Sequence, residues 1–87
     1  MKVTDDVVRR EIAGETLLIP VGEAALRLNG LVSLNETGAF LWDLLNEERT
    51  AEELTGALCR EFDVAEETAA ADVAAFLSQV KEAGLLV

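Results

Sequence analysis

The hydrophobic pattern of this chain changes character at Asn35, and this change limits the folds that are open to it. Before Asn35, two runs rich in β-branched and aliphatic residues, 7–12 and 16–21, are typical of strands. After Asn35, apolar residues recur every three or four positions, which indicates amphipathic helices. A chain with strands first and helices second is expected to fold as an α+β domain.

Turn signals divide the first part of the chain into three strands. Ala13-Gly14 forms a short hairpin connection, and Pro20 suits the end of the second strand because it lacks a backbone N–H. Gly22 indicates a turn or bulge, without fixing the structure of the residues that follow it. Asn29-Gly30 favours a tight turn because both residues tolerate positive φ, and it leads into a third strand over residues 31–34.

Capping residues mark three helices. Asn35 is a good N-cap for the first helix, which is apolar on more than one face and should therefore be central and buried. Residues 50–53 have a capping-box pattern, and residues 63–66 repeat it before a helix that runs to about residue 83. Gly84 suits the end of this last helix. The second helix carries a stripe of Leu54, Leu58 and Phe62, and the third carries an apolar face of Ala69, Val73, Phe76, Val80 and Ala83.

These elements predict the order βββααα, in which a three-stranded antiparallel sheet is followed by a three-helix bundle with a winged-helix-like architecture. We expect a single domain over residues 1–87, with strands in about residues 7–34 and helices in about residues 36–83. The N-terminal residues have no apolar signal-like core, and no apolar run is long enough to span a membrane, so the expected location is the cytosol.

The whole chain has a formal net charge of −10, and its acidic residues concentrate in the helical part. Residues 1–34 hold four Lys/Arg and five Asp/Glu, a net of −1, whereas residues 35–87 hold three and twelve, a net of −9. Such a field repels nucleic-acid phosphates and anionic membranes, and it favours cationic partners. A DNA-binding winged helix needs a basic recognition helix, but the second and third predicted helices carry only Arg60 and Lys81. We therefore expect neither a nucleic-acid nor a membrane partner.

Groups for catalysis or metal binding are scarce. The chain has no histidine, and its one cysteine, Cys59, lies on an amphipathic helix where a structural thiol is expected. Carboxylate pairs at 47–48, 52–53 and 66–67 sit at predicted helix starts, where acids stabilise the helix dipole. No glycine-rich phosphate loop is present. We therefore expect a protein that is not an enzyme and binds no metal.

One segment carries a family resemblance. Residues 30–42, Gly-Leu-Val-Ser-Leu-Asn-Glu-Thr-Gly-Ala-Phe-Leu-Trp, join a short apolar strand to a helix that bears Trp42. This segment resembles the signature of the PqqD family, the peptide chaperones of pyrroloquinoline quinone biosynthesis and their relatives. The second half of the chain agrees with the family pattern at residues 49–54, 61–64, 72–73, 76–77 and 83–86.

The resemblance implies a role. Family members bind the leader segment of a ribosomally made precursor peptide as a strand added to the sheet edge, in a groove between the third strand and the third helix. They hand the peptide to a modifying enzyme, often a radical S-adenosylmethionine enzyme, and they bind no cofactor themselves. The resemblance therefore implies that this chain is a non-catalytic, peptide-binding adaptor.

The expected peptide-binding site combines one strand edge with one helix shoulder. The third strand carries no charge, and an uncharged edge is open to strand addition. On the third helix, small side chains beside the core face would let a peptide approach, although helix preference alone would also explain the alanines. Which shoulder faces the strand does not follow from the sequence. The predicted site residues are Leu31, Val32, Ser33, Leu34, Ala70, Val73, Ala74, Leu77 and Lys81.

Other interpretations of these features remain open. The uncharged edge could instead pair with a second copy, in a dimeric structural or regulatory winged-helix module that binds no leader peptide, so the sequence fits a monomer or a homodimer. Residues 35–38 fit a purely structural strand-to-helix junction, and Trp42 fits a core anchor better than a ligand platform.

Overall fold

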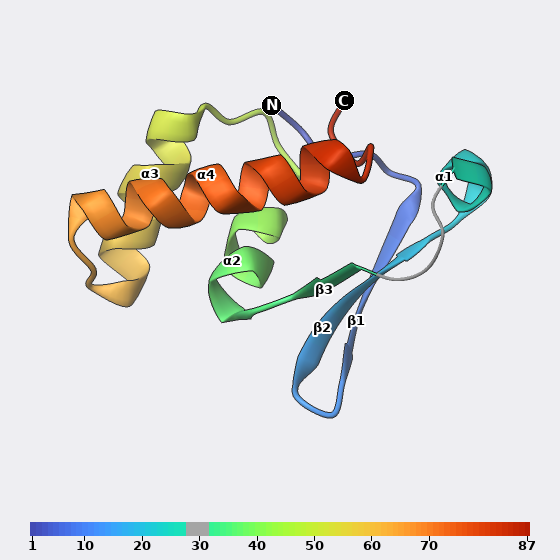
Figure 1. Cartoon of the computed structure of the whole chain (residues 1–87), viewed down its shortest axis with the longest axis horizontal. Coiled ribbons are helices and arrows are strands. Elements are labelled where there is room, and N and C mark those ends of the chain that lie inside the picture. The colour runs from blue at the N-terminus through green and yellow to red at the C-terminus, as the bar shows by residue number, and fades with distance from the viewer. Residues whose placement is uncertain (28–31) are drawn as a thin grey trace.

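The structure, a computed structural model, describes residues 1–27 and 32–87 (Figure 1). It confirms the predicted α+β order of a three-stranded antiparallel sheet and then three helices, with one short helix added. The predicted Asn29-Gly30 turn and Leu31 lie outside the described residues. The elements are β1 (Val7–Ile12), β2 (Glu15–Pro20), α1 (Gly22–Arg27), β3 (Val32–Leu34), α2 (Glu36–Leu44), α3 (Ala51–Phe62) and α4 (Glu66–Glu82).

The added helix, α1, fills the stretch that the sequence left unassigned. Gly22, where the sequence indicated a turn or bulge, has a φ of +57° and is the first residue of this single short helix. Six residues are too few to show a helical hydrophobic period, so only the good helix formers after Gly22 hinted at this element. In Figure 1, α1 lies at the far end of the sheet, away from α2, α3 and α4.

The sheet has the strand order β1-β2-β3. The β1–β2 hairpin turns through Ala13 and Gly14, both at positive φ, as the hairpin prediction requires. Between β2 and β3 the register pairs Leu17 with Ser33. Because side chains alternate between the two faces of a sheet, the residues before and after this pair on each strand point to the other face. That face is the buried one, with Thr16, Leu18 and Leu34 at 7%, 0% and 5% exposure.

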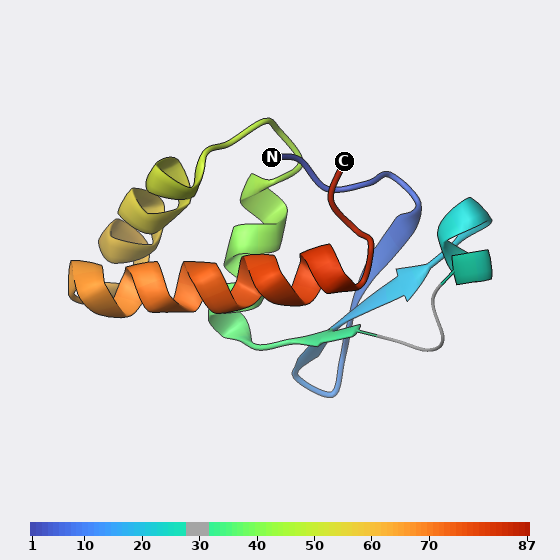
Figure 2. The ribbon, with the colours of Figure 1, turned by 45° about the horizontal axis from the view of Figure 1, so that its top comes forward.

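Helix α2 is central, as predicted. Leu41, Trp42 and Leu45 are buried, and α4 crosses in front of α2 in Figure 2. The predicted faces of the other helices also enter the core. Leu54 and Leu58 of α3 are fully buried. The α4 face is at most 4% exposed at each of Ala69, Val73, Phe76 and Val80.

The two predicted capping boxes have different outcomes. The first is confirmed: Glu53 N donates to Thr50 Oγ1 at 3.1 Å, and Thr50 N donates to Glu53 Oε1 at 3.0 Å. The second is wrong, because Asp63 is in the left-handed conformation that ends α3 and so cannot also cap α4. Ala65 is the N-cap of α4, and it makes no side-chain hydrogen bond.

The end segments of the chain pair with each other. Val3 bridges to Leu86, Thr4 N donates to the Leu85 carbonyl at 2.8 Å, and Val87 N donates to the Lys2 carbonyl at 2.8 Å. Gly84, at a φ of +73°, turns the chain out of α4 as predicted, and Leu85 is fully buried. The termini therefore lie close together (Figure 2). None of the helices described is long and apolar enough to cross a membrane.

Candidate functional site

The third strand has one side without a strand partner in the described part of the chain. β3 pairs with β2, and the side chains of Val32 and Leu34 point towards the core while Ser33 is exposed. On the unpaired side, Gln79 Nε2 of α4 donates to the Ser33 carbonyl oxygen at 3.3 Å. Because the N–H and C=O of one residue point the same way in an antiparallel strand, the Ser33 N–H also faces this edge.

A hollow of about 310 Å³ separates this edge from α4. We name it the β3–α4 hollow. Its strand side contains Ser33 and its α4 side contains Gln79, the two residues joined by the hydrogen bond. The other lining residues are Asn35, Thr37, Gly38, Asp72, Ala75 and Phe76. Backbone donors and acceptors at such an edge bind an extended chain by strand addition.

The strand-to-helix junction shapes one wall of this hollow. Asn35 Oδ1 accepts hydrogen bonds from Gly38 N at 2.8 Å and from Thr37 Oγ1 at 3.1 Å, which confirms Asn35 as the N-cap of α2. A Cβ at Gly38 would lie only 3.0 Å from Asn35 Oδ1 and 3.4 Å from Leu34 Cδ2. The absence of a side chain at Gly38 therefore lets the cap and β3 approach each other closely. The cap at Asn35 and the close packing at Gly38 are the structural contacts that the junction interpretation expects.

The predicted site residues fall on different surfaces. Val32, Ser33 and Leu34 form β3, whereas Leu31 lies outside the described residues. Val73 is 2% exposed and belongs to the core. The remaining predicted residues do not line the β3–α4 hollow: Ala70, Ala74 and Leu77 line a separate hollow against α3, and Lys81 is exposed in the last turn of α4.

Sequence reasoning missed the residues with which α4 faces β3. Asp72, Ala75 and Gln79 lie on the opposite shoulder of the helix from Ala70 and Ala74. The helical period places both shoulders beside the core face. Which one meets the strand depends on how α4 crosses the domain, and the sequence pattern does not contain that angle. The polar pair Asp72 and Gln79, seven residues apart, was the available signal.

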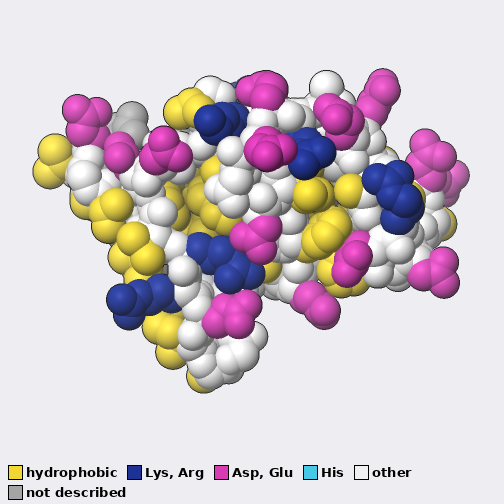
Figure 3. All heavy atoms as spheres, turned by 180° about the vertical axis from the view of Figure 1, so that it is seen from behind, with side chains coloured by type: hydrophobic (Ala, Val, Ile, Leu, Met, Phe, Trp, Pro, Cys, Tyr) yellow, Lys and Arg dark blue, Asp and Glu magenta, His cyan; other side chains and the backbone are white. Residues whose placement is uncertain are grey.

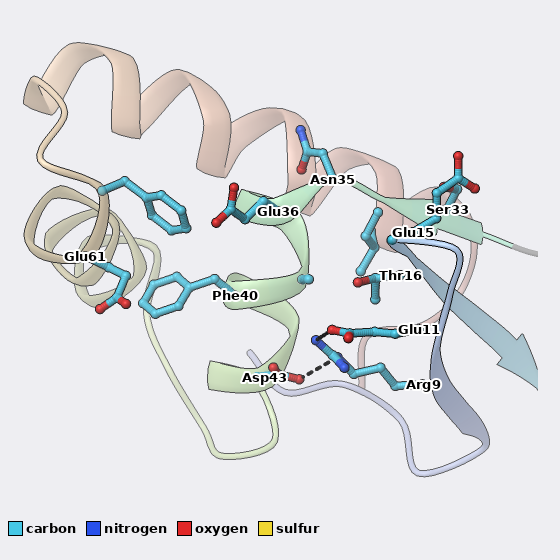
Figure 4. A pocket seen from close by; sticks show the side chains of 14 residues that line it. Arg9, Glu11, Glu15, Thr16, Ser33, Asn35, Glu36, Phe40, Asp43 and Glu61 are labelled. Atoms are coloured by element: carbon cyan, nitrogen blue, oxygen red, sulfur yellow. Dashed lines mark hydrogen bonds and ion pairs between the residues drawn. The ribbon is translucent and has the colours of Figure 1, made fainter.

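A second, acidic hollow adjoins the β3–α4 hollow (Figure 4). It has a volume of about 690 Å³, and both hollows are lined by Ser33 and Asn35. Arg9 Nε lies 3.0 Å from Asp43 Oδ1, in an ion pair that is not aligned as a hydrogen bond, and Arg9 Nη2 lies 3.4 Å from Glu11 Oε1. The lining carboxylates are Glu11, Glu15, Glu36, Asp43 and Glu61.

Aromatic rings form the other part of this acidic hollow. Phe40 and Phe62 pack edge to face, with ring centroids 5.5 Å apart and planes at 84°, and both are half-buried. Figure 3 shows this side of the molecule, where carboxylates spread over the surface and hydrophobic side chains appear between them. Arg9 is the arginine that lines this hollow, and it is paired with acids. The hollow therefore favours a cationic or apolar side chain of a ligand over an anionic one.

Among residues 1–27 and 32–87, no group of three His, Cys, Asp or Glu side chains is placed to hold a metal ion. Cys59 is half-buried on α3, at the hollow between α3 and α4. The Thr50 amide that donates to the Glu53 carboxylate lowers the pKa of Glu53, and this acid caps a helix.

The fold and the free edge beside α4 define the class: a small α+β domain that presents an edge strand next to a helix. The chain belongs to the PqqD family, because the model of that family, described as Coenzyme PQQ synthesis protein D (PqqD), matches residues 15–86. It is similar to a solved structure of TbiB1 in complex with the TbiA(beta) leader peptide. The TM-score is 0.75 at 30% sequence identity, and the match covers 99% of this chain and 94% of that chain. A comparison with curated proteins finds no match.

Proposed function

We propose that this chain is an adaptor that binds the leader segment of a ribosomally made precursor peptide and presents it to the enzyme that modifies that peptide. The leader adds to β3 as a further antiparallel or parallel strand, in the β3–α4 hollow. The adaptor itself is non-catalytic and binds no cofactor, and it works in the cytosol. A radical S-adenosylmethionine enzyme is the partner that the family resemblance implies.

The observation that carries this proposal is the free edge at Ser33, held beside α4 by one side-chain hydrogen bond of 3.3 Å. Membership of the PqqD family supports it, and so does the likeness to a structure in which TbiB1 holds a leader peptide. Strand addition takes its affinity from backbone hydrogen bonds and its specificity from pockets beside the strand. The β3–α4 hollow and the acidic hollow are the two pockets next to this edge.

The contacts of α4 with the peptide are assigned to Asp72 and Ala75 on its β3-facing shoulder, and the added strand displaces the hydrogen bond that Gln79 makes there in the free protein. Ala70, Ala74, Leu77 and Lys81 were predicted for this role from the sequence, and that assignment stays a prediction. Their position on the other shoulder makes a direct contact with a strand at β3 the less favoured geometry.

The test is a proton–nitrogen NMR titration with synthetic leader segments of precursor peptides encoded near this chain's gene. We expect shifts concentrated on residues 32–34 and on the β3-facing shoulder of α4, with a Kd of about micromolar or tighter. A matched leader with N-methylated backbone amides at alternate positions keeps every side chain but loses donors. Alternate positions can be methylated in two ways, on the odd or on the even residues. One of these two leaders should bind at least about tenfold more weakly, because its methyl groups fall on the amides that face β3.

The outcomes separate the proposal from its rival. Equal binding of the methylated and unmethylated leaders would contradict strand addition. No shifts with any leader, together with concentration-dependent shifts of the same residues, would instead establish a dimeric module that uses this edge for self-association. Light scattering with and without peptide measures the oligomeric state in both cases.

A further inference from the structure

The largest of the three hollows described lies between α3 and α4, on the other side of α4 from β3. We name it the α3–α4 groove. Its volume is about 820 Å³, and Figure 2 shows the two helices meeting at the turn between them and diverging from there. Thr55, Gly56 and Cys59 line it from α3, and Ala70, Ala74 and Leu77 line it from α4.

The floor of the groove is apolar and is only partly covered by the fold itself. Val73 is buried beneath the groove, Leu77 and Cys59 are half-buried, and Ala70 and Ala74 are exposed. Gly56 stands inside α3, where glycine costs about 1 kcal/mol relative to alanine. A Cβ there would meet only Arg60 Nη1, at an ordinary 3.5 Å. Internal packing therefore does not demand a glycine at this position, yet its missing side chain keeps the groove open.

The surroundings of the groove are strongly acidic. Residues 51–82, which contain α3 and α4, hold eight Asp/Glu against Arg60 and Lys81, a net of −6. Glu52 and Glu66 stand in the groove lining together with Arg60, so the lining itself carries a net of −1 within this more acidic region. An apolar groove with carboxylates at its margin complements apolar side chains flanked by Lys or Arg. The 12 residues of α3 extend for about 18 Å, which is the length of a helical segment of about three turns.

We propose that the α3–α4 groove docks a basic amphipathic segment of the modifying enzyme. The inference rests on the proposed function, because an adaptor must hold its enzyme while the peptide occupies β3. The groove meets that need: its lining shares no residue with the β3–α4 hollow. Helix α4 then carries the peptide on one shoulder and the enzyme on the other.

The test uses a probe of the proposed chemistry, an amphipathic helix of about 14 residues made of Leu and Lys, with a Leu/Glu helix of the same pattern as its counterpart. Cys59 is the one cysteine of the chain, so its rate of alkylation reports directly on the groove. The Leu/Lys probe should slow alkylation of Cys59 at least about fivefold and shift the NMR signals of Ala70 and Ala74, whereas the Leu/Glu probe should do neither.

Two variants with the same charge change locate the binding. Ala74→Lys places bulk and positive charge in the groove, and Ser78→Lys places the same side chain on an exposed position of α4 that lines none of the three hollows. Ala74→Lys should weaken binding of the Leu/Lys probe about tenfold, and Ser78→Lys by about twofold or less. Equal effects of the two variants would overturn the proposal, because they would report general charge attraction only.

A leader titration keeps this inference separate from the proposed function. Leader and probe should bind wild type together, and Thr55→Lys, which changes the groove from its α3 side, should leave leader affinity unchanged. A leader that displaces the probe would overturn the inference and assign Ala70, Ala74 and Leu77 to the peptide site. Leader binding at β3 without probe binding in the groove would overturn the inference alone. Probe binding without any leader binding would overturn the proposed function, and the adaptor role of the groove with it.

Discussion

Helix α4 has a strand on one side and a helix on the other, and the two sides are held in place differently. Towards α3, it packs through fully buried residues such as Leu54, Leu58 and Val73. Towards β3, the hydrogen bond from Gln79 to Ser33 is 3.3 Å long and exposed. The first kind of contact contributes several kcal/mol per side chain, and the second contributes about 1 kcal/mol.

This difference separates the work of folding from the work of binding. The α3 side carries the stability of the helical part, so it cannot open without loss of the core. The β3 side can exchange its hydrogen bond for one to an incoming chain while α4 stays in place. A strand-binding edge needs this asymmetry, because the peptide must be admitted without unfolding its host.

The largest effect should follow from weakening the buried side. Leu58→Ala is expected to lower the free energy of unfolding by about 2–5 kcal/mol, because Leu58 is fully buried in the core. Urea denaturation followed by circular dichroism measures this change. Gln79→Ala, on the strand side, should cost about 1 kcal/mol or less in the same assay. Similar costs for the two variants would contradict the asymmetry.

The next effect concerns the strand edge itself. Ser33→Pro removes the N–H that faces the free edge while leaving the β2 pairing in place, so it should weaken leader binding at least about tenfold with a folded domain retained. Isothermal titration calorimetry measures the affinity. Ser33→Ala is the matched control, since it loses only the exposed hydroxyl and keeps the N–H. If Ser33→Pro bound the leader as wild type does, the peptide would lie elsewhere.

A smaller effect of opposite sign should come from Gln79. In the free protein its amide occupies the Ser33 carbonyl that an added strand would use. Gln79→Ala should therefore raise leader affinity by about two- to tenfold and increase self-association through the uncovered edge. Titration and light scattering test the two effects, with Ser78→Ala as an exposed control on the same helix. A fall in affinity would mean that Gln79 binds the peptide instead of competing with it.

The smallest effect should be a pH dependence at the start of α3. The Thr50 amide lowers the pKa of Glu53 in the folded state, so the stability that this carboxylate contributes is present above the ordinary carboxyl range. It is lost as pH falls below the ordinary carboxyl range and through the lowered folded-state pKa. Wild type should be more stable than Glu53→Gln at pH 7, with the difference shrinking in acid. Glu52→Gln is the control, because Glu52 takes no part in the capping box. A stability difference between wild type and Glu53→Gln that did not change with pH would contradict the role of the Glu53 carboxylate.

Local chemistry in the sequence predicted most of the elements. Asn35, Thr50 and Gly84 mark helix ends through interactions within a few residues, so their roles are readable without a structure. The same logic failed at Asp63, because one residue cannot both end α3 in a left-handed conformation and cap α4. The pattern at residues 63–66 fits a cap, but the turn between two packed helices decides the conformation.

The candidate site was predicted in part, for a related reason. The edge at residues 32–34 follows from strand order and from the lack of charge, which the sequence contains. The facing shoulder of α4 depends on a crossing angle between distant elements. Ala70 and Ala74 suggested that a peptide could approach α4 closely, because their side chains are small. The residues of α4 that lie beside the strand are instead Asp72 and Gln79.

The pairing of Val3 with Leu86 has a consequence for rebuilding the chain in a different order. Because the two end segments are hydrogen-bonded neighbours, a short linker would join them without crossing β3 or the α3–α4 groove. New ends could then be opened in the Ala13-Gly14 turn, where an added Cβ at Gly14 meets no neighbour within 4 Å. Such a circular permutant would keep β3 and α4 on one continuous stretch, with both new ends at the hairpin tip.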